Sequence, residues 1–123
     1  MRSAAAEGAG LRDIVMPVSV TRYALTGNVA NTGGGLWFSY YCYPILTDCV
    51  INSNAANYTG SSGTGSGGGV LCEDYSLVTL RGCDLSGNTA AWGGGINAVQ
   101  ATMTNCTVIG NTATGTSPSP AGG

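Results

Sequence analysis

The amino-acid sequence predicts an all-β fold, a right-handed single-stranded parallel β-helix of about four coils. Three observations predict it: a Cys–Asn motif recurs along the chain, glycine triplets recur between its copies, and the apolar residues show no helical period. Glycine triplets and β-branched residues disfavour helices, whereas apolar and polar residues alternate around each motif as in a strand with one buried face. Each copy is therefore expected to form one lap of a wound ribbon.

The first repeat has the form C-x-Φ-x-x-N-x-A, where Φ is aliphatic, and an earlier copy, "YALTGNVA", carries Tyr23 in place of the cysteine. Laps stacked at about 4.8 Å place equivalent residues above one another. We therefore expect a column of small buried thiols and a column of asparagine side chains that hydrogen-bond from coil to coil. The cysteine column comprises Cys49, Cys83 and Cys106, and the asparagine column comprises Asn28, Asn54, Asn88 and Asn111.

Two kinds of bend are expected between the strands. Each asparagine of the column follows Gly or Ser, which indicates a tight bend in which the asparagine itself adopts the left-handed conformation. The glycine triplets, residues 33–35, 67–69 and 93–95, each precede an aliphatic residue and predict a second bend that is too sharp for a Cβ. The insertion "NYTGSSGTGS" in the second copy is expected to leave the coil as a loop.

The predicted coils cover residues 20–115. Residues 1–19 are expected to add an N-terminal strand or cap, because the apolar face of a terminal coil needs a cover. Residues 116–123 are rich in Ser, Pro and Gly and are expected to form a flexible tail. Because the first residues lack the apolar segment of a signal peptide, the chain is either cytosolic or a piece of a longer protein whose export signal lies elsewhere, and we expect the second.

The composition argues against several classes of function. Charged residues make up 8% of the chain, against about 25% in ordinary globular proteins. Four basic and six acidic residues leave a net charge of −2, so neither nucleic acid nor an anionic membrane is an expected partner. No apolar stretch is long enough for a transmembrane helix. Without histidine or a C-x-x-C pair, neither a metal nor any other cofactor is expected.

The repeats "CTVIGNTA", "CDLSGNTA" and "GGGI" resemble those of chlamydial polymorphic outer membrane proteins and related autotransporter passenger domains. Those proteins carry GGA-[ILV] and FxxN motifs, whereas this chain has GGG-[LVI] and C-x-x-x-x-N. The resemblance implies a pectin-lyase-like solenoid that is exported, displayed at the cell surface in association with the outer membrane, and adhesive. It further implies a glycan or protein of a host cell or matrix as the partner.

Catalysis is the main alternative, because many β-helix proteins act on acidic polysaccharides. Such enzymes need clustered carboxylates, with bound Ca²⁺ and a basic residue in the lyases. Asp48 and Asp84 flank the cysteine column on opposite sides, which predicts different orientations. Glu73, Asp74 and Arg81 share one coil and form either a small cluster or a solvated rim. With no histidine to activate Ser or Thr, we expect no enzyme activity; a fragment of a pectate-lyase-like enzyme remains the alternative.

Aromatic residues supply the candidate contact surface. In "LWFSYYCYP", strand alternation places Leu36 and Phe38 inside and the neighbouring aromatic rings outside. Exposed rings on a rigid face are suited to binding sugar rings or a protein. The candidate contact residues are Trp37, Tyr40, Tyr41, Tyr43, Tyr58 and Trp92.

The remaining candidates are modification sites. Cys42 and Cys72 fall outside the cysteine column and are a candidate disulfide between coils in an exported protein. Sequons at Asn57 and Asn105 are candidate glycosylation sites if the source glycosylates its exported proteins. Together these features predict a non-enzymatic, cell-surface or secreted scaffold or adhesin. A filament-forming subunit that associates end to end is a second alternative.

Overall fold

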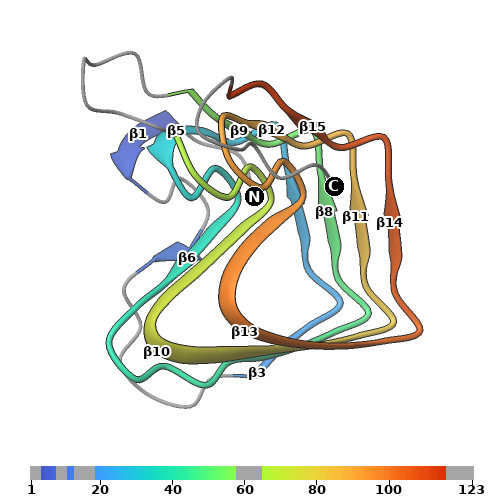
Figure 1. The fold of residues 1–123 in the computed structure, drawn as a ribbon. Helices are drawn as coiled ribbons and strands as arrows, with labels where there is room; N and C mark the ends of the chain where they lie inside the picture. The colour runs from blue at the N-terminus through green and yellow to red at the C-terminus, as the bar shows by residue number, and fades with distance from the viewer. Residues whose placement is uncertain (1–3, 8–10, 13–18, 58–64, 116–123) are drawn as a thin grey trace.

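The computed structural model describes residues 4–7, 11–12, 19–57 and 65–115, and all regular structure within these ranges is β-strand. The chain winds as a ribbon around three faces, which confirms the predicted parallel β-helix (Figure 1). Tyr58, the tail 116–123 and most of the expected N-terminal cap lie outside the described residues. No helix within the described ranges is long and apolar enough to cross a membrane.

The three faces are parallel sheets, named here A, B and C. Sheet A has the order β1 (Ala4–Glu7), β5 (Val29–Thr32), β9 (Ala55–Ala56), β12 (Thr89–Ala90) and β15 (Thr112–Ala113). Sheet B has the order β2 (Leu11–Arg12), β6 (Leu36–Phe38), β10 (Val70–Arg81), β7 (Ile45–Thr47) and β3 (Ser19–Thr21), and β13 (Ile96–Thr104) pairs with β10. Sheet C has the order β14 (Thr107–Ile109), β11 (Asp84–Ser86), β8 (Val50–Asn52) and β4 (Ala24–Thr26).

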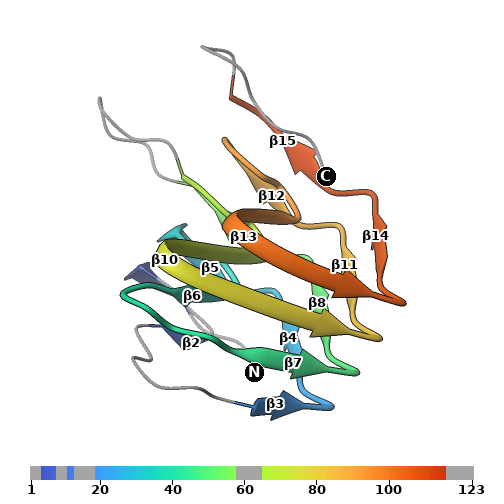
Figure 2. The ribbon, with the colours of Figure 1, turned by 60° about the horizontal axis from the view of Figure 1, so that its bottom comes forward.

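Successive coils lie directly above one another, as Figure 2 shows. Coil 1 comprises β2–β5, coil 2 β6–β9, coil 3 β10–β12 and coil 4 β13–β15. β10 is long because it pairs with β6 through its first residues and with β7 through its last. Sheet B therefore bends at one corner, between β6 and β7 in coil 2 and within β10 in coil 3 (Figure 1).

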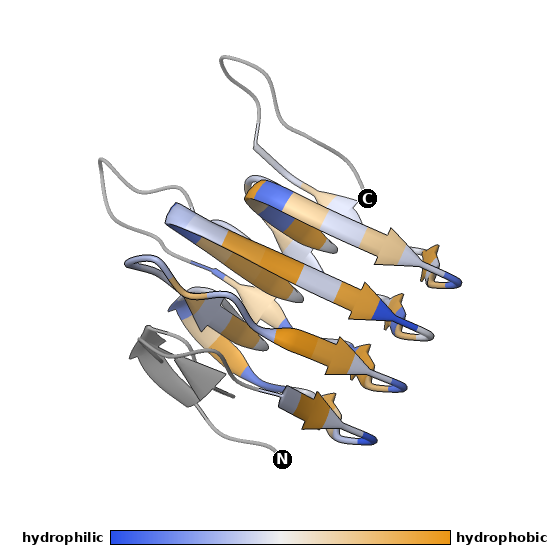
Figure 3. Ribbon diagram, turned by 90° about the horizontal axis from the view of Figure 1, so that it is seen from below, coloured by the Kyte–Doolittle hydropathy of each residue, from blue (hydrophilic) through white to orange (hydrophobic). Residues whose placement is uncertain are grey.

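The core is built from equivalent positions of successive coils. Leu25, Ile51 and Leu85 occupy one register position in sheet C, and all three are fully buried. Burying such a side chain contributes about 1.5–3 kcal/mol. In Figure 3, apolar and polar residues alternate along the strands of sheet B, and polar residues occupy the turns that lead to sheet C. One face of each strand therefore supplies the core.

The cysteine column lies beside this core. Cys49 and Cys83 are buried and Cys106 is half-buried. The Cys49 thiol donates to the backbone oxygen of Val20 at 3.3 Å, and the Cys83 thiol donates to that of Leu46 at 3.5 Å. The two thiols thus pack as small buried side chains, and each donates a hydrogen bond to the backbone of the preceding coil.

The asparagine column forms a hydrogen-bonded ladder. Nδ2 of Asn28, Asn54 and Asn88 donates to Oδ1 of the next asparagine along the column, at 3.0 Å in each case. A second Nδ2 hydrogen of Asn54 reaches the Leu25 backbone oxygen at 2.8 Å, and the Asn28 backbone N–H donates to Asn54 Oδ1 at 3.0 Å. Each buried amide of the interior is therefore satisfied by the coil before it and the coil after it.

The expected conformation of these asparagines is wrong in one respect. The left-handed residue is the one before each asparagine: Gly27, Ser53, Gly87 and Gly110, with φ between 57° and 66°. Asparagine itself does not have positive φ at these positions. The preceding residue makes the turn, and this leaves the asparagine side chain pointing inward, where it joins the ladder.

The glycine triplets form the bend between sheets A and B. Gly33, Gly67 and Gly93 begin their triplets with φ of 61°, 65° and 62°. A Cβ on Gly34, the middle residue of the first triplet, would lie 2.5 Å from the Gly68 backbone oxygen of the next coil. The first glycine is thus needed for its backbone conformation, and the middle one for the close approach of two coils.

Among the described residues, the core positions of coil 4 are more exposed than those of the inner coils. Val108 occupies the position of Leu85 but is 42% exposed, and Met103 occupies the position of Leu80 but is 38% exposed, whereas both inner residues are 0% exposed. Among the described residues, β13, β14 and β15 each pair with strands on one side alone. Within the described residues, coil 4 therefore has partly exposed apolar core positions and strand edges with no paired neighbour.

Candidate functional site: an aromatic corner

The bend in sheet B carries a group of exposed side chains. In coil 2 the bend lies between β6 and β7, and in coil 3 it lies within β10. Tyr40 and Tyr41 form it in coil 2, and Asp74 and Tyr75 form it in coil 3. We name these four residues, together with Trp37 and Glu73, the aromatic corner.

The backbone of the corner is left-handed in both coils. Tyr40 and Tyr41 have φ of 60° and 58°, and Asp74 and Tyr75 have φ of 54° and 62°. A non-glycine residue pays about 1–2 kcal/mol for this conformation. Elsewhere, the left-handed turn positions of the described chain hold either glycine or a non-glycine residue such as Asp48 or Ser53.

Hydrogen bonds and burial hold the strained corner in place. The backbone N–H of Tyr41 donates to the backbone oxygen of Asp74 at 3.0 Å, which ties the two coils together. The backbone N–H of Cys42 donates to the hydroxyl of buried Ser76 at 2.9 Å. Cys42 and Cys72, which flank the corner residues in the two coils, are both buried. The corner is therefore a surface feature on a fixed support.

The tyrosine rings project away from this support. Tyr40, Tyr41 and Tyr75 are 63%, 59% and 73% exposed. The rings of Tyr41 and Tyr75 are stacked, with centroids 5.2 Å apart and planes 12° from parallel. This stack follows the coil-to-coil direction, because the two residues belong to neighbouring coils.

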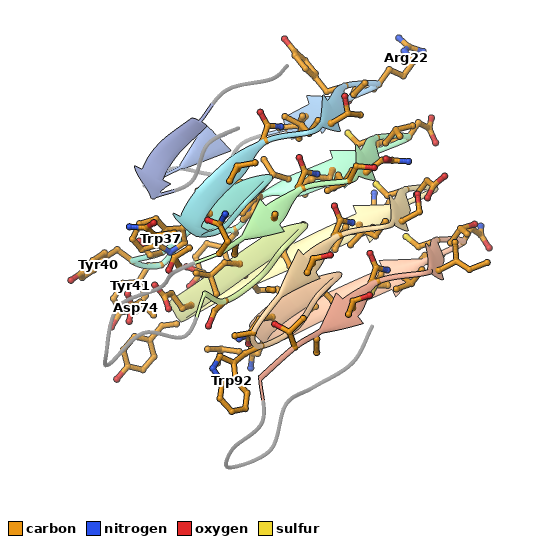
Figure 4. All side chains as sticks on the ribbon, turned by 90° about the horizontal axis from the view of Figure 1, so that it is seen from above. Arg22, Trp37, Tyr40, Tyr41, Asp74 and Trp92 are labelled. Atoms are coloured by element: carbon orange, nitrogen blue, oxygen red, sulfur yellow. The ribbon has the colours of Figure 1, made fainter. Side chains whose placement is uncertain are left out.

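Trp37 and Glu73 border the tyrosines. The indole Nε1 of Trp37 donates to Glu73 Oε1 at 2.9 Å, again between neighbouring coils. Figure 4 shows Trp37, Tyr40, Tyr41 and Asp74 on one side of the molecule, with Arg22 at the opposite end of the ribbon. The corner thus combines aromatic faces with two carboxylates.

The structure separates the predicted contact residues into groups. Trp37, Tyr40 and Tyr41 lie in the corner; Tyr43 is exposed just beyond it, before β7. Trp92 lies apart from the corner, next to the third glycine triplet (Figure 4). Its backbone forms an isolated parallel β-bridge with Ser66. Tyr58 is outside the described residues.

Sequence reasoning missed Tyr75 as a contact residue. A signal for it was present: Tyr41 follows Gly35 by six residues (41 − 35), and Tyr75 follows Gly69 by six (75 − 69). Counting from the triplets, rather than from the aromatic-rich segment alone, would have placed the two tyrosines above one another.

The candidate disulfide residues are free thiols in the structure. Burial and the neighbouring Cys42 raise the pKa of Cys72 to about 11, and burial raises the pKa of Cys42. Burial also raises the pKa of Cys83 in the cysteine column. Thiols with raised pKa values stay protonated at neutral pH and are poor nucleophiles. The Cys42–Cys72 disulfide stays a prediction.

The carboxylates do not form a single site. Glu73 and Asp74 lie in the aromatic corner, whereas Arg81 is at the far end of β10, at the turn toward sheet C. Among the residues that the structure describes, no three His, Cys, Asp or Glu side chains gather as metal ligands. The sequon residues Asn57 and Asn105 are both exposed, and Asn105 occupies a left-handed turn position.

Comparisons with known proteins agree with this architecture. A family model described as a right-handed beta helix region matches residues 19–119. No curated protein matched the chain, and no solved structure matched it.

Proposed function

Because the chain belongs to the family of right-handed β-helix proteins, we propose that it is a non-enzymatic, cell-surface or secreted scaffold that acts as an adhesin passenger. Its coils provide a rigid rod, and its aromatic corner provides the contact surface. The partner is a glycan or protein of a host cell or matrix.

The exposed tyrosines are the observation that carries this proposal. Three rings stand out from one corner on strained backbone, and two of them stack between coils. Exposed aromatic groups on a rigid support bind with little loss of conformational entropy, since a tyrosine has few rotatable bonds. Such residues dominate the energy of many interfaces.

The ladder and the sheets support the scaffold role. The side-chain amides of the asparagines join the coils through hydrogen bonds of 3.0 Å, and parallel strands add hydrogen bonds along all three faces. A solenoid of this kind holds a surface group at a constant position relative to its neighbours. Adhesion that must resist displacement benefits from such pre-organisation.

The test measures retention of the purified chain on immobilised glycans, matrix proteins and cells. Tyr40→Ala combined with Tyr41→Ala is expected to weaken retention about tenfold or more. Tyr23→Ala is the matched control, because Tyr23 is 52% exposed but lies at the turn between sheets B and C. Equal retention of the double variant and the parent would refute the proposal. Turnover of polygalacturonate would favour the alternative, a fragment of a pectate-lyase-like enzyme.

The open face of coil 4 favours a second candidate function, end-to-end assembly into filaments. Val108 and Met103 would lose their exposed apolar area if another coil covered them. Association that grows with concentration in analytical ultracentrifugation is expected, and Val108→Lys should abolish it. Val29→Lys is the control, because Val29 is similarly exposed but lies on β5, an interior strand of sheet A. A monomer at every concentration would rule this candidate out.

A further inference from the structure

The aromatic stack of the corner ends abruptly at coil 3. Between Cys72 and Leu77 coil 3 has four residues, whereas coil 4 passes from Ala98 to Gln100 through Val99 alone, so coil 3 is three residues longer at the corner. Coil 4 therefore has no residue in register with Asp74 or Tyr75. Tyr75 is 73% exposed, the largest exposed fraction among the large apolar side chains described.

This ending forms a ledge. Tyr41 stacks on one face of the Tyr75 ring, and no described aromatic ring stacks on the other. Val99, which is 65% exposed, lies where coil 4 takes the shorter path. The ledge is defined here by the exposed ring of Tyr75, the neighbouring Asp74 in the chain, and the exposed Val99 on the shorter path of coil 4.

We infer that this ledge binds one ring of an uncharged glycan, which extends the Tyr41–Tyr75 stack. The inference rests on the proposed adhesive function and names its ligand class. A pyranose ring presents an apolar C–H face to the aromatic ring, and its hydroxyl groups can donate to the Asp74 carboxylate.

The local charge distribution selects an uncharged ligand over an acidic one. Glu73 and Asp74 are the charged residues that adjoin Tyr75 in the chain, whereas Arg22 and Arg81 lie at the turn between sheets B and C. Arg12 in β2 pairs with Trp37, two strands away from β10. A uronate or sulfated sugar would meet repulsion at the ledge.

The test uses the full chain and two sets of probes of equal length, neutral oligosaccharides and oligogalacturonates, in titration calorimetry and NMR. Neutral probes are expected to shift the resonances of Tyr75 and Val99, and Tyr75→Ala is expected to weaken their binding about tenfold. Tyr75→Phe, which keeps the ring face, should bind within about threefold of the parent. Tyr23→Ala serves as the control for an exposed tyrosine outside the ledge.

The outcomes separate this inference from the proposed function. If cells or matrix are retained through Tyr40 and Tyr41 but neutral probes do not bind, the ledge assignment is wrong and the adhesive function stands. Preference for oligogalacturonates, or unchanged binding in a folded Tyr75→Ala variant, likewise overturns the assignment. If neither probes, cells nor matrix bind, both proposals fail. Folding of each variant is checked by its melting temperature.

Discussion

The asparagine ladder gives the sharpest prediction about stability, through Asn54→Ala. Asn54 lies within the ladder and is 1% exposed. Its Oδ1 accepts from the backbone N–H and Nδ2 of Asn28, both at 3.0 Å. Its Nδ2 donates to the Leu25 backbone oxygen at 2.8 Å and to Asn88 Oδ1 at 3.0 Å. The substitution thus removes four side-chain hydrogen bonds at once.

The expected cost follows from these contacts. Each bond contributes about 1 kcal/mol net, and a buried group left without a partner costs about 1–3 kcal/mol. Asn28 and Leu25 are buried, so water does not readily replace the lost amide. We expect Asn54→Ala to lower the free energy of unfolding by about 4–6 kcal/mol, a large part of the 5–15 kcal/mol that is typical of a domain.

Equilibrium unfolding in urea, followed by far-UV circular dichroism, measures this change. Asn52→Ala is the matched control: Asn52 is half-buried, and its Nδ2 donates to the Ser86 hydroxyl at 3.1 Å. It should cost less than about 1 kcal/mol. If Asn54→Ala costs no more than Asn52→Ala, the ladder is not a main source of stability and the reasoning fails.

Three further predictions concern the corner, the glycine bend and the thiols. Tyr40→Gly relieves a left-handed tyrosine, so the melting temperature is expected to stay equal or rise while ligand retention falls; a clear drop in melting temperature would contradict strain at this position. Gly34→Ala places a Cβ 2.5 Å from the Gly68 oxygen and should destabilise by about 3 kcal/mol or more in urea unfolding; near-parent stability would show that the coils can move apart. The pKa of Cys72 is raised from 9.0 to about 11, so the folded state holds its proton more tightly than the unfolded state. The contribution of Cys72 to the free energy of unfolding should therefore be constant below about pH 9 and fall between about pH 9 and 11, and Cys72→Ala should reduce the alkaline loss of stability; an unchanged profile in the variant would refute this assignment.

The sequence alone determined the winding of the chain. In a solenoid, each lap contacts its neighbours at equivalent positions, so a spacing repeated in the sequence becomes a column in space. The Cys–Asn motif and the glycine triplets therefore predicted the fold class and pointed to the buried columns. Strand alternation also predicted that Phe38 points inward, where it is fully buried, whereas Trp37 on the other face is half-buried.

The tertiary structure decided the details that the sequence repeat left open. Either member of the Gly–Asn pair can adopt the left-handed conformation of the turn. In the structure Gly27 and its equivalents adopt it, because the asparagine side chain points inward and its amide hydrogen-bonds to the next coil. The stacking of Tyr75 on Tyr41 and the ledge beyond it depend on corner residues that coil 3 has and coil 4 lacks. The physical reason is that a repeat specifies positions along a lap, whereas a binding surface depends on where neighbouring laps differ in length.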